Sequence, residues 1–142
     1  MSEPVNAQAW HELREHTGEI VLRVRAPSLN GLFVEAARGL AELSLGSQQA
    51  RPSGSPRTLS LEARDPAALL VDWLNELIYL AETERWVALE FEAVEATSTT
   101  LRVQARGATL DRAPSLVKAA TLHGLHLVRE NGLMQADVVL DV

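Results

Sequence analysis

The segment from Asp65 to Ala81 constrains the fold most, because it carries both a helix start signal and a long apolar stripe. Asp is a favoured N-cap residue, and Pro66 is favoured in the first helical position, where its missing N–H is not needed. Apolar residues then recur at helical spacing: Leu69, Leu70, Trp73, Leu74, Leu77, Ile78 and Ala81. This spacing predicts a helix that buries one face. The remaining polar positions are expected mostly on the opposite face: Asp72, Asn75, Glu76 and Tyr79. Asp72, Asn75 and Glu76 could contact a partner there, and a solvated face is the alternative.

A second helix is predicted after Ser28, which is a favourable N-cap residue. Its apolar stripe consists of Leu29, Leu32, Phe33, Ala36, Ala37, Leu40 and Leu43. Gly46 is expected to end this helix, because glycine readily adopts the backbone conformations found just after helices. From Gly46 to Pro56 the chain is rich in Ser, Gln, Gly and Pro, which indicates an exposed loop over residues 46–56.

Most of the other patterned segments alternate between apolar and polar residues, which is typical of half-buried strands. Strands are predicted at residues 10–15, 19–26, 58–63, 87–92, 101–106, 121–130 and 133–141. Asn131-Gly132 is a strong hairpin signal between the last two. The order of elements predicts an α+β fold, in which two helices pack on a large sheet that is mainly antiparallel or mixed.

Composition excludes several classes of function. The chain has 142 residues, of which 46% are hydrophobic, so it suits a single domain over residues 1–142. It has no cysteine, which excludes disulfides, thiolate catalysis and zinc–thiolate sites. A net charge of −6 argues against direct binding of nucleic acid, because the phosphate backbone is also negative.

Targeting signals are not evident in the sequence. Met1 to Pro4 show no basic region leading into an apolar one, as a signal peptide would. The apolar runs fall far short of the ~20 residues that cross a bilayer. A cytoplasmic protein that does not bind membranes is therefore expected.

The first candidate site is His16-Thr17-Gly18-Glu19, which lies between two predicted strands. A turn at this place lets an imidazole, a hydroxyl and a carboxylate converge, and together they can bind a cation. The alternative is a plain turn with solvated polar groups, which is common in loops of this type.

The second candidate is Asp141-Val142, where the sequence stops on a predicted strand. If the strand is held in the sheet, the carboxylate of Asp141 and the α-carboxylate of Val142 are held close together. A hard cation such as Ca²⁺ or Mg²⁺ would relieve their repulsion. The alternative is a frayed end that happens to contain an aspartate.

The third candidate joins Lys118, Thr121 and His123, as an anion site or a place that carries a proton. The alternative is a surface lysine with a histidine at the start of a strand. His11 and His126 are less specific still. The sequence has no Gly-rich phosphate loop, no Ser-centred nucleophile elbow and no His-Glu-x-x-His helix, so no nucleophile with an adjacent base is evident.

Taken in order, these segments resemble the archease family over nearly the whole chain, from Trp10 to Val142. Residues 16–20 are similar to the family's His-Thr-Ala-Asp-Ile. Two helical pieces follow, Ala-Ala-Arg-Gly-Leu at residues 36–40 and Trp-Leu-Asn-Glu-Leu at residues 73–77. Residues 118–124 are similar to the family's Lys-Ala-Val-Thr-Tyr-His segment, and the acidic end at Asp141 completes the series. Each piece alone is weak, whereas five in order are specific.

The resemblance implies an accessory protein, not an enzyme. Archeases assist the RtcB-type RNA ligase, which joins RNA ends in tRNA splicing and RNA repair. A member of the family is expected to promote guanylylation of the ligase, to help it turn over and to widen its nucleotide use. The resemblance also implies a divalent cation, with calcium expected, held by Glu19, Asp141 and the main chain of Val142. Lys118 matches a residue needed for activation, and His16, Thr17, Thr121 and His123 belong to the same functional segments.

The sequence departs from the family pattern at three places. Glu19 stands where the family usually has Asp, which moves the carboxylate by about a bond length, while ligand distances in metal sites vary by only about 0.2 Å. Leu122 replaces the usual Tyr, and a family His is absent around Asp111 to Pro114. The change at Glu19 is expected to alter metal affinity or metal choice, and the departures together are expected of a diverged member with altered partner use.

Two other functions fit the residues. A metal at Glu19 and Asp141 with His123 as general acid or base would make a phosphoester hydrolase. A general chaperone or binding module would instead expose a large apolar patch.

Overall fold

The computed structural model describes residues 9–115 and 117–142, and Met1 to Pro4 lie outside these ranges. The described chain follows the order of elements expected from the α+β pattern. The elements are β1 (Trp10–His16), β2 (Glu19–Ala26), α1 (Leu29–Leu45), β3 (Ser53–Glu62), α2 (Pro66–Glu84), β4 (Trp86–Ala96), β5 (Thr100–Thr109), β6 (Ala119–Thr121), β7 (Leu127–Glu130) and β8 (Leu133–Asp141).

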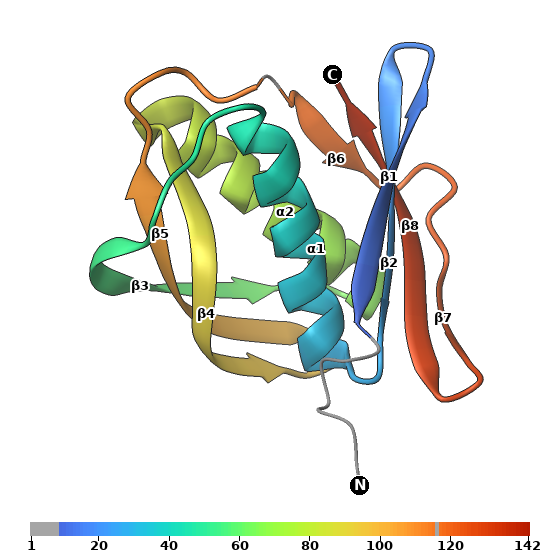
Figure 1. The fold of residues 1–142 in the computed structure, drawn as a ribbon. Helices are drawn as coiled ribbons and strands as arrows, with labels where there is room; N and C mark the ends of the chain where they lie inside the picture. Colours follow the sequence, from blue (N-terminus) through green and yellow to red (C-terminus); the bar gives the residue numbers. More distant parts are fainter. Residues whose placement is uncertain (1–8, 116) are drawn as a thin grey trace, which may run out of the picture.

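The strands form two sheets, as Figure 1 shows. The five-stranded sheet has the order β1-β2-β8-β6, and β7 also pairs with β8. β6 pairs with residues 139–141 of β8 and β7 with residues 133–136. The three-stranded sheet has the order β3-β5-β4, and the pairings in both sheets are antiparallel.

Both helices start where the sequence predicts, and α1 ends at Leu45, just before the expected Gly46. α2 runs past its last predicted apolar position, Ala81, to Glu84. The Ser28 side chain accepts a hydrogen bond from Gly31 N at 3.0 Å, and Asp65 Oδ1 accepts one from Ala68 N at 2.8 Å. These caps satisfy main-chain donors that the first turn leaves free. Trp73 of α2 is fully buried and its indole Nε1 donates to the carbonyl of Phe33 in α1 at 2.9 Å, which joins the two helices.

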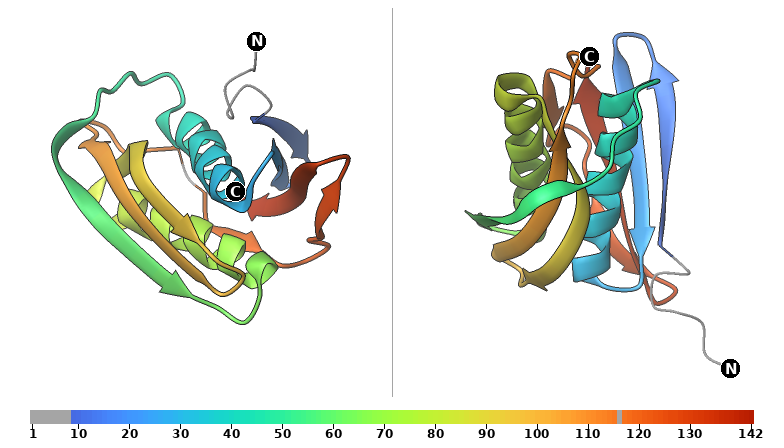
Figure 2. Two further views of the ribbon diagram at one scale, coloured as in Figure 1. Left: turned by 90° about the horizontal axis from the view of Figure 1, so that it is seen from below. Right: turned by 60° about the vertical axis from the view of Figure 1, so that its left-hand side comes forward.

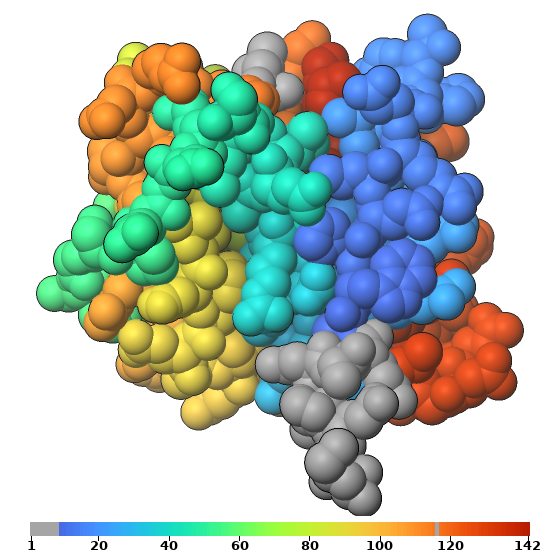
Figure 3. Space-filling model, in the orientation of Figure 1, coloured from blue at the N-terminus to red at the C-terminus, as the bar shows by residue number. Residues whose placement is uncertain are grey.

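The α+β class and the two packed helices are confirmed, but the strands divide between two sheets where one large sheet was expected. The reason lies in the width of the buried helix faces. In α1 the buried side chains extend well around the helix, from Leu32 and Phe33 to Ala37 and Ala41. One sheet covers only one side of a helix, so α1 contacts β2 of one sheet and β4 of the other. Figure 2 shows α1 between the two sheets, and Figure 3 shows its outer surface filling the space between β4 and β1.

One apolar cluster joins the two sheets and the two helices. Leu22 and Val138 come from the five-stranded sheet, Val103 from the three-stranded sheet, and Leu40 and Trp73 from the helices. The site described below is therefore held by the main core. In the described ranges, no helix is long and apolar enough to cross a membrane.

Several predicted boundaries were wrong. The strands predicted over residues 87–92 and 101–106 are longer, because β4 runs to Ala96 and β5 to Thr109. The exposed loop expected over residues 46–56 ends earlier, because β3 begins at Ser53. β3 lies at the edge of its sheet and its register shifts between Ser53 and Arg57, a setting that tolerates Pro56. The single strand expected over residues 121–130 is divided into β6 and β7 by an exposed turn in which Gly124 has a φ of 67°.

The expected hairpin at Asn131-Gly132 is present. Asn131 has a φ of 53° and Gly132 a φ of 77°, which are the positive angles that a tight two-residue hairpin turn requires. The turn connects β7 to β8.

Candidate functional site

The first predicted site residues lie at the tip of the β1–β2 hairpin. Thr17 and Gly18 form the turn, and Gly18 has a φ of 74°, in the left-handed region that favours glycine. The turn pairs His16 with Glu19, and His16 Nδ1 lies 3.4 Å from Glu19 Oε1. The tip therefore presents an imidazole, a hydroxyl and a carboxylate together.

Strand pairing brings the end of β8 to this tip. Glu19 is the antiparallel partner of Asp141, and the side chains of directly paired residues lie on the same face of a sheet. Figure 1 shows the end of β8 beside the hairpin and β6. Val142 lines a shallow, open depression with Thr17 and Glu19. Two carboxylates that are distant in the sequence thus share one end of the sheet.

Lys118 reaches the same end of the sheet through its main chain. Its N–H donates a hydrogen bond to the carbonyl of Asp141 at 2.8 Å, and Ala119 is the strand partner of Asp141. The Lys118 residue is exposed. The third candidate segment therefore begins beside the second.

The rest of that segment runs away from the two carboxylates. Thr121 pairs with Val139, and its buried Oγ1 has no hydrogen-bond partner among the described residues. His123 lies two residues beyond the end of β6, in the exposed turn before β7. Strand pairing does not bring His123 to Glu19 or Asp141, so the sheet gives no support to the general acid or base of the hydrolase interpretation.

The donor set at this end suits a hard cation. Two carboxylates and the main-chain oxygen of Val142 are the oxygen ligands that calcium takes, and an open edge lets water complete the shell. Within residues 9–115 and 117–142, no three His, Asp or Glu side chains are grouped closely enough to hold a metal by themselves. A cation here would therefore depend on the main chain and on water as well as on Glu19 and Asp141.

Asn75 is a residue whose part in the site the sequence did not reveal. It was expected on the polar face of α2, but it is half-buried and bonds to Ala120 of β6. Asn75 Nδ2 donates to the Ala120 carbonyl at 3.1 Å, and Ala120 N donates to Asn75 Oδ1 at 2.8 Å. The sequence did contain one signal. Asparagine is disfavoured in helix interiors unless its side chain has a hydrogen-bond partner, and Asn75 lies in the interior of a predicted helix.

His11 also has a specific place, on the side of β1 that faces α1. Its Nδ1 lies 2.6 Å from Glu35 Oε2 and its Nε2 lies 2.5 Å from Glu42 Oε2. Burial lowers the pKa of His11, but the hydrogen bonds and charges of Glu42 and Glu35 outweigh burial and raise this pKa above its ordinary value of 6.5. Gly39 makes room for the ring, because a Cβ there would lie 3.1 Å from His11 Cδ2. The bridge ties the hairpin to α1.

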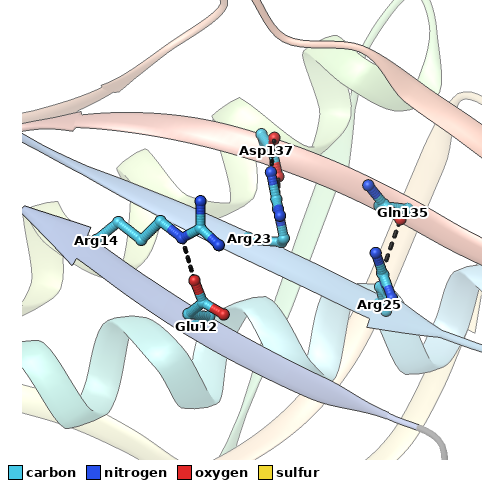
Figure 4. A network of polar contacts seen from close by, with 6 residues as sticks. All are labelled: Glu12, Arg14, Arg23, Arg25, Gln135 and Asp137. Atoms are coloured by element: carbon cyan, nitrogen blue, oxygen red, sulfur yellow. Dashed lines mark hydrogen bonds and ion pairs between the residues drawn. The ribbon is translucent and has the colours of Figure 1, made fainter.

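The outer face of the five-stranded sheet carries paired charges, as Figure 4 shows. Arg23 donates two hydrogen bonds to Asp137, from Nε at 2.9 Å and from Nη2 at 3.2 Å. Arg25 Nε donates to Gln135 at 2.7 Å, and Arg14 contacts Glu12. These three arginines are matched by neighbours on the sheet, so they do not form a free basic strip.

Together the fold and the site define a class of small α+β protein, in which one end of a sheet gathers two carboxylates and a lysine around a hairpin tip. The model of the archease protein family matches residues 11–142. This chain belongs to the archease family.

Individual relatives agree with this assignment. A protein archease from Methanopyrus kandleri is 33% identical over 140 residues, which cover 94% of this chain and 99% of that protein. One from Methanosarcina barkeri is 26% identical and covers 93% of this chain and 95% of its own length.

Solved structures show the same fold. The solution structure of Methanobacterium thermoautotrophicum protein 1598 matches with a TM-score of 0.76 at 24% identity, covering 93% of this chain and 98% of that one. The crystal structure of a Thermotoga maritima archease, described as a possible chaperone, matches with a TM-score of 0.67 at 20% identity over 100% of this chain and 98% of its own. The expected resemblance is thus confirmed.

Proposed function

We propose that this protein is a non-enzymatic accessory protein that activates an RtcB-type RNA ligase, promoting its guanylylation and multiple turnover in tRNA splicing and RNA repair. Family membership supports the proposal. The observation that carries it is the pairing of Glu19 with Asp141 beside the Asp141–Lys118 main-chain bond. Three segments that the family resemblance marks as functional are thereby gathered at one end of the sheet.

Within this proposal, Glu19, Asp141 and the main-chain oxygen of Val142 hold a divalent cation, and calcium is the expected ion. When bound, the cation supplies a positive centre that offsets the two carboxylates and attracts phosphate oxygens. Glu19 carries an extra methylene relative to the usual Asp, and the open edge of the hairpin gives this longer side chain room to adjust.

Lys118 adds a mobile positive charge next to this centre. Its main chain is fixed by the bond to Asp141, while its side chain extends from an exposed residue. An ammonium group on a flexible stem suits an anionic group on the ligase or its nucleotide. His16 Nδ1 lies 3.4 Å from Glu19 Oε1 at the same tip.

The direct test mixes the full-length protein with its cognate ligase and labelled GTP. We expect faster labelling of the ligase and repeated rounds of RNA joining when the protein is present. Lys118→Ala and Asp141→Asn should lose most of this gain, whereas Arg129→Ala on β7 and Asp137→Asn on β8 should keep it. Arg129 is exposed, and Asp137 is half-buried and bonded to Arg23. An unchanged rate of guanylylation and of multiple turnover with the wild-type protein contradicts the proposal.

The cation is tested separately by calorimetric titration with calcium chloride. Glu19→Gln and Asp141→Asn should each lower the affinity at least about tenfold, because each removes a charged oxygen ligand. Asp137→Asn is the matched control, because Asp137 lies on the same strand and the same face of the sheet as Asp141. Equal affinities in all four proteins would remove the cation from the proposal.

A second candidate function, a general chaperone, has the description of the Thermotoga maritima structure in its favour. Large exposed apolar side chains occur at Tyr79 of α2, at Val128 of β7, and at Leu122 and Val142, which directly follow β6 and β8. Light scattering decides between the two functions: a chaperone suppresses the aggregation of unrelated unfolded proteins, whereas the ligase activator leaves it unchanged.

A further inference from the structure

The amide of Asn75 occupies the free edge of a very short strand. β6 has only three residues, Ala119–Thr121, and it ends its path in the sheet, with β8 on one side. Ala120 is 4% exposed, and both its N–H and its carbonyl bond to the Asn75 side chain. The amide thus makes the two bonds that a neighbouring strand would otherwise provide.

Without this amide the main-chain groups of Ala120 would lie buried and unbonded, which is costly. A three-residue strand has few other bonds to hold it in place. Lys118 precedes β6 directly, and its N–H is bonded to the carbonyl of Asp141. Any shift of Ala120 along α2 therefore also shifts Lys118 relative to Asp141.

We propose that Asn75 is a positioning residue, whose amide holds β6 on α2 so that Lys118 is kept beside Asp141. The functional part of this inference rests on the proposed function, because Lys118 and Asp141 are taken as the working end. Within the described residues, the side chain of Asn75 forms its hydrogen bonds with Ala120, so the proposed effect on Lys118 acts through Ala120.

The chain contains a matched control for this role. Asn30 of α1 makes the same kind of amide contact with β4, as its Nδ2 donates to Val94 O at 3.1 Å and its Oδ1 accepts from Ala96 N at 2.9 Å. That contact is exposed and belongs to the other sheet. Asn30→Ala therefore removes the same chemistry without touching β6.

Hydrogen exchange of the full-length protein tests the positioning directly. In Asn75→Ala, the amides of Lys118, Ala120 and Thr121 should exchange about tenfold or more faster, since local opening becomes easier. Asn30→Ala should leave them unchanged. Unaltered exchange at these amides in Asn75→Ala overturns the proposal.

A pH profile of Asn75→Asp separates the amide contact from simple packing. A neutral carboxyl group carries one acceptor and one O–H donor, so it can replace both amide bonds, whereas a carboxylate faces the Ala120 carbonyl with like charge. The protection of Ala120 relative to wild type should therefore be near normal at about pH 3, below the ordinary Asp pKa of about 3.9, and should fall toward pH 7 as the introduced group ionises. A pH-independent ratio overturns the proposal, and this variant also answers the question if Asn75→Ala does not fold.

Ligase activation then shows whether positioning matters for function. Asn75→Ala should raise the protein concentration needed for half-maximal guanylylation several-fold, and Asn30→Ala should not. If the wild-type protein does not activate the ligase, the proposed function fails, while the exchange data still decide the role of Asn75. If Lys118→Ala activates the ligase normally, the role of Lys118 fails, and with it the functional part of the positioning by Asn75. If Lys118→Ala is inactive and Asn75→Ala activates like wild type, positioning by Asn75 is overturned.

Discussion

Asn30 and Asn75 make similar bonds in different surroundings. Each lies on a helix and directs its amide at the edge of a strand, Asn30 at β4 and Asn75 at β6. β4 runs from Trp86 to Ala96 and is paired with β5 along most of its length, whereas β6 spans three residues. The Asn30 contact is exposed and the Asn75 contact is half-buried.

The comparison shows what decides how much a hydrogen bond stabilises the fold. It depends on whether other bonds hold the same strand in place and on whether water can replace the lost partner. If the Asn30 amide is lost, water can replace it and β4 stays in its ladder. If the Asn75 amide is lost, buried main-chain groups lose their partner and little else fixes β6. We therefore expect the contact of Asn75 with β6 to influence the candidate site. The contact of Asn30 only covers part of the edge of β4.

The largest effect is expected from Trp73, which joins α1 and α2, the helices that carry Asn30 and Asn75. Trp73→Ala should lower the free energy of unfolding by about 3–5 kcal/mol, since it empties a fully buried site and leaves the Phe33 carbonyl without its donor. Guanidinium denaturation followed by circular dichroism measures this loss. Tyr79→Ala on the same helix is the control, because that ring is 57% exposed and its removal should cost about 0.5 kcal/mol or less. Similar losses for both variants would place the junction of the helices elsewhere.

The next prediction compares the two asparagine contacts themselves. Asn75→Ala should cost about 1–3 kcal/mol, the range for a buried main-chain group left unbonded, and Asn30→Ala about 1 kcal/mol or less. The same denaturation experiment gives both values under one set of conditions. A larger loss for Asn30→Ala would contradict the ranking by burial.

The third prediction compares these neutral amide contacts with a charged contact, the bridge between His11 and α1. His11 bridges Glu35 and Glu42, Arg38 Nη1 lies 3.5 Å from Glu35, and the pKa of His11 is raised in the folded protein. The stabilisation is therefore complete below the ordinary pKa of 6.5 and is lost as pH rises through the higher folded value. His11→Gln should cost about 1 kcal/mol at acidic pH, after allowance for partial exposure.

Unfolding free energies measured across about pH 5.5 to 8.5 check this sign. The difference between wild type and His11→Gln should shrink as pH rises, because other titrating groups are common to both proteins. The difference for Asn75→Ala should stay flat over the same range. A His11→Gln difference that grows with pH would mean that the histidine is bridged in its neutral form.

The smallest effect belongs to the solvated face of the same sheet. Arg23→Gln removes a bidentate pair with Asp137, but the two side chains are 29% and 38% exposed. We expect a loss of about 0.5 kcal/mol, falling further in high salt because exposed charges are screened. Denaturation at two salt concentrations measures it. A loss that matches Asn75→Ala would show that burial does not rank these contacts.

Local signals account for the parts of the fold that the sequence predicted. Ser28, Asp65 and Pro66 act within one helical turn, and Asn131-Gly132 within one hairpin, so their effects can be read from neighbouring residues. β6 could not be found in this way, because three residues are too few to show a period of two. The second sheet was not predicted. The sequence shows how wide the apolar face of a helix is, but it does not show whether one sheet or two cover that face.

The candidate site has the same division. The types of residue at Glu19, Asp141 and Lys118 indicated cation and anion chemistry, but pairing between β2 and β8 is not local, and only the family resemblance linked them beforehand. Asn75 was hidden because its partner is main chain, and a helical pattern treats every polar position alike.

The central place of β8 has a consequence for synthesis on the ribosome. β8 pairs with β2, β6 and β7, yet it follows every one of them in the chain, and the contact of Arg23 with Asp137 spans 114 residues. At roughly 5–20 residues per second, β2 waits about 6–23 s with one edge open before its partner is made. During that interval the nascent chain exposes an unpaired, half-apolar strand that other chains can bind. The pairing of Glu19 with Asp141 also waits for β8, so the candidate site is among the last parts of the sheet to form during synthesis.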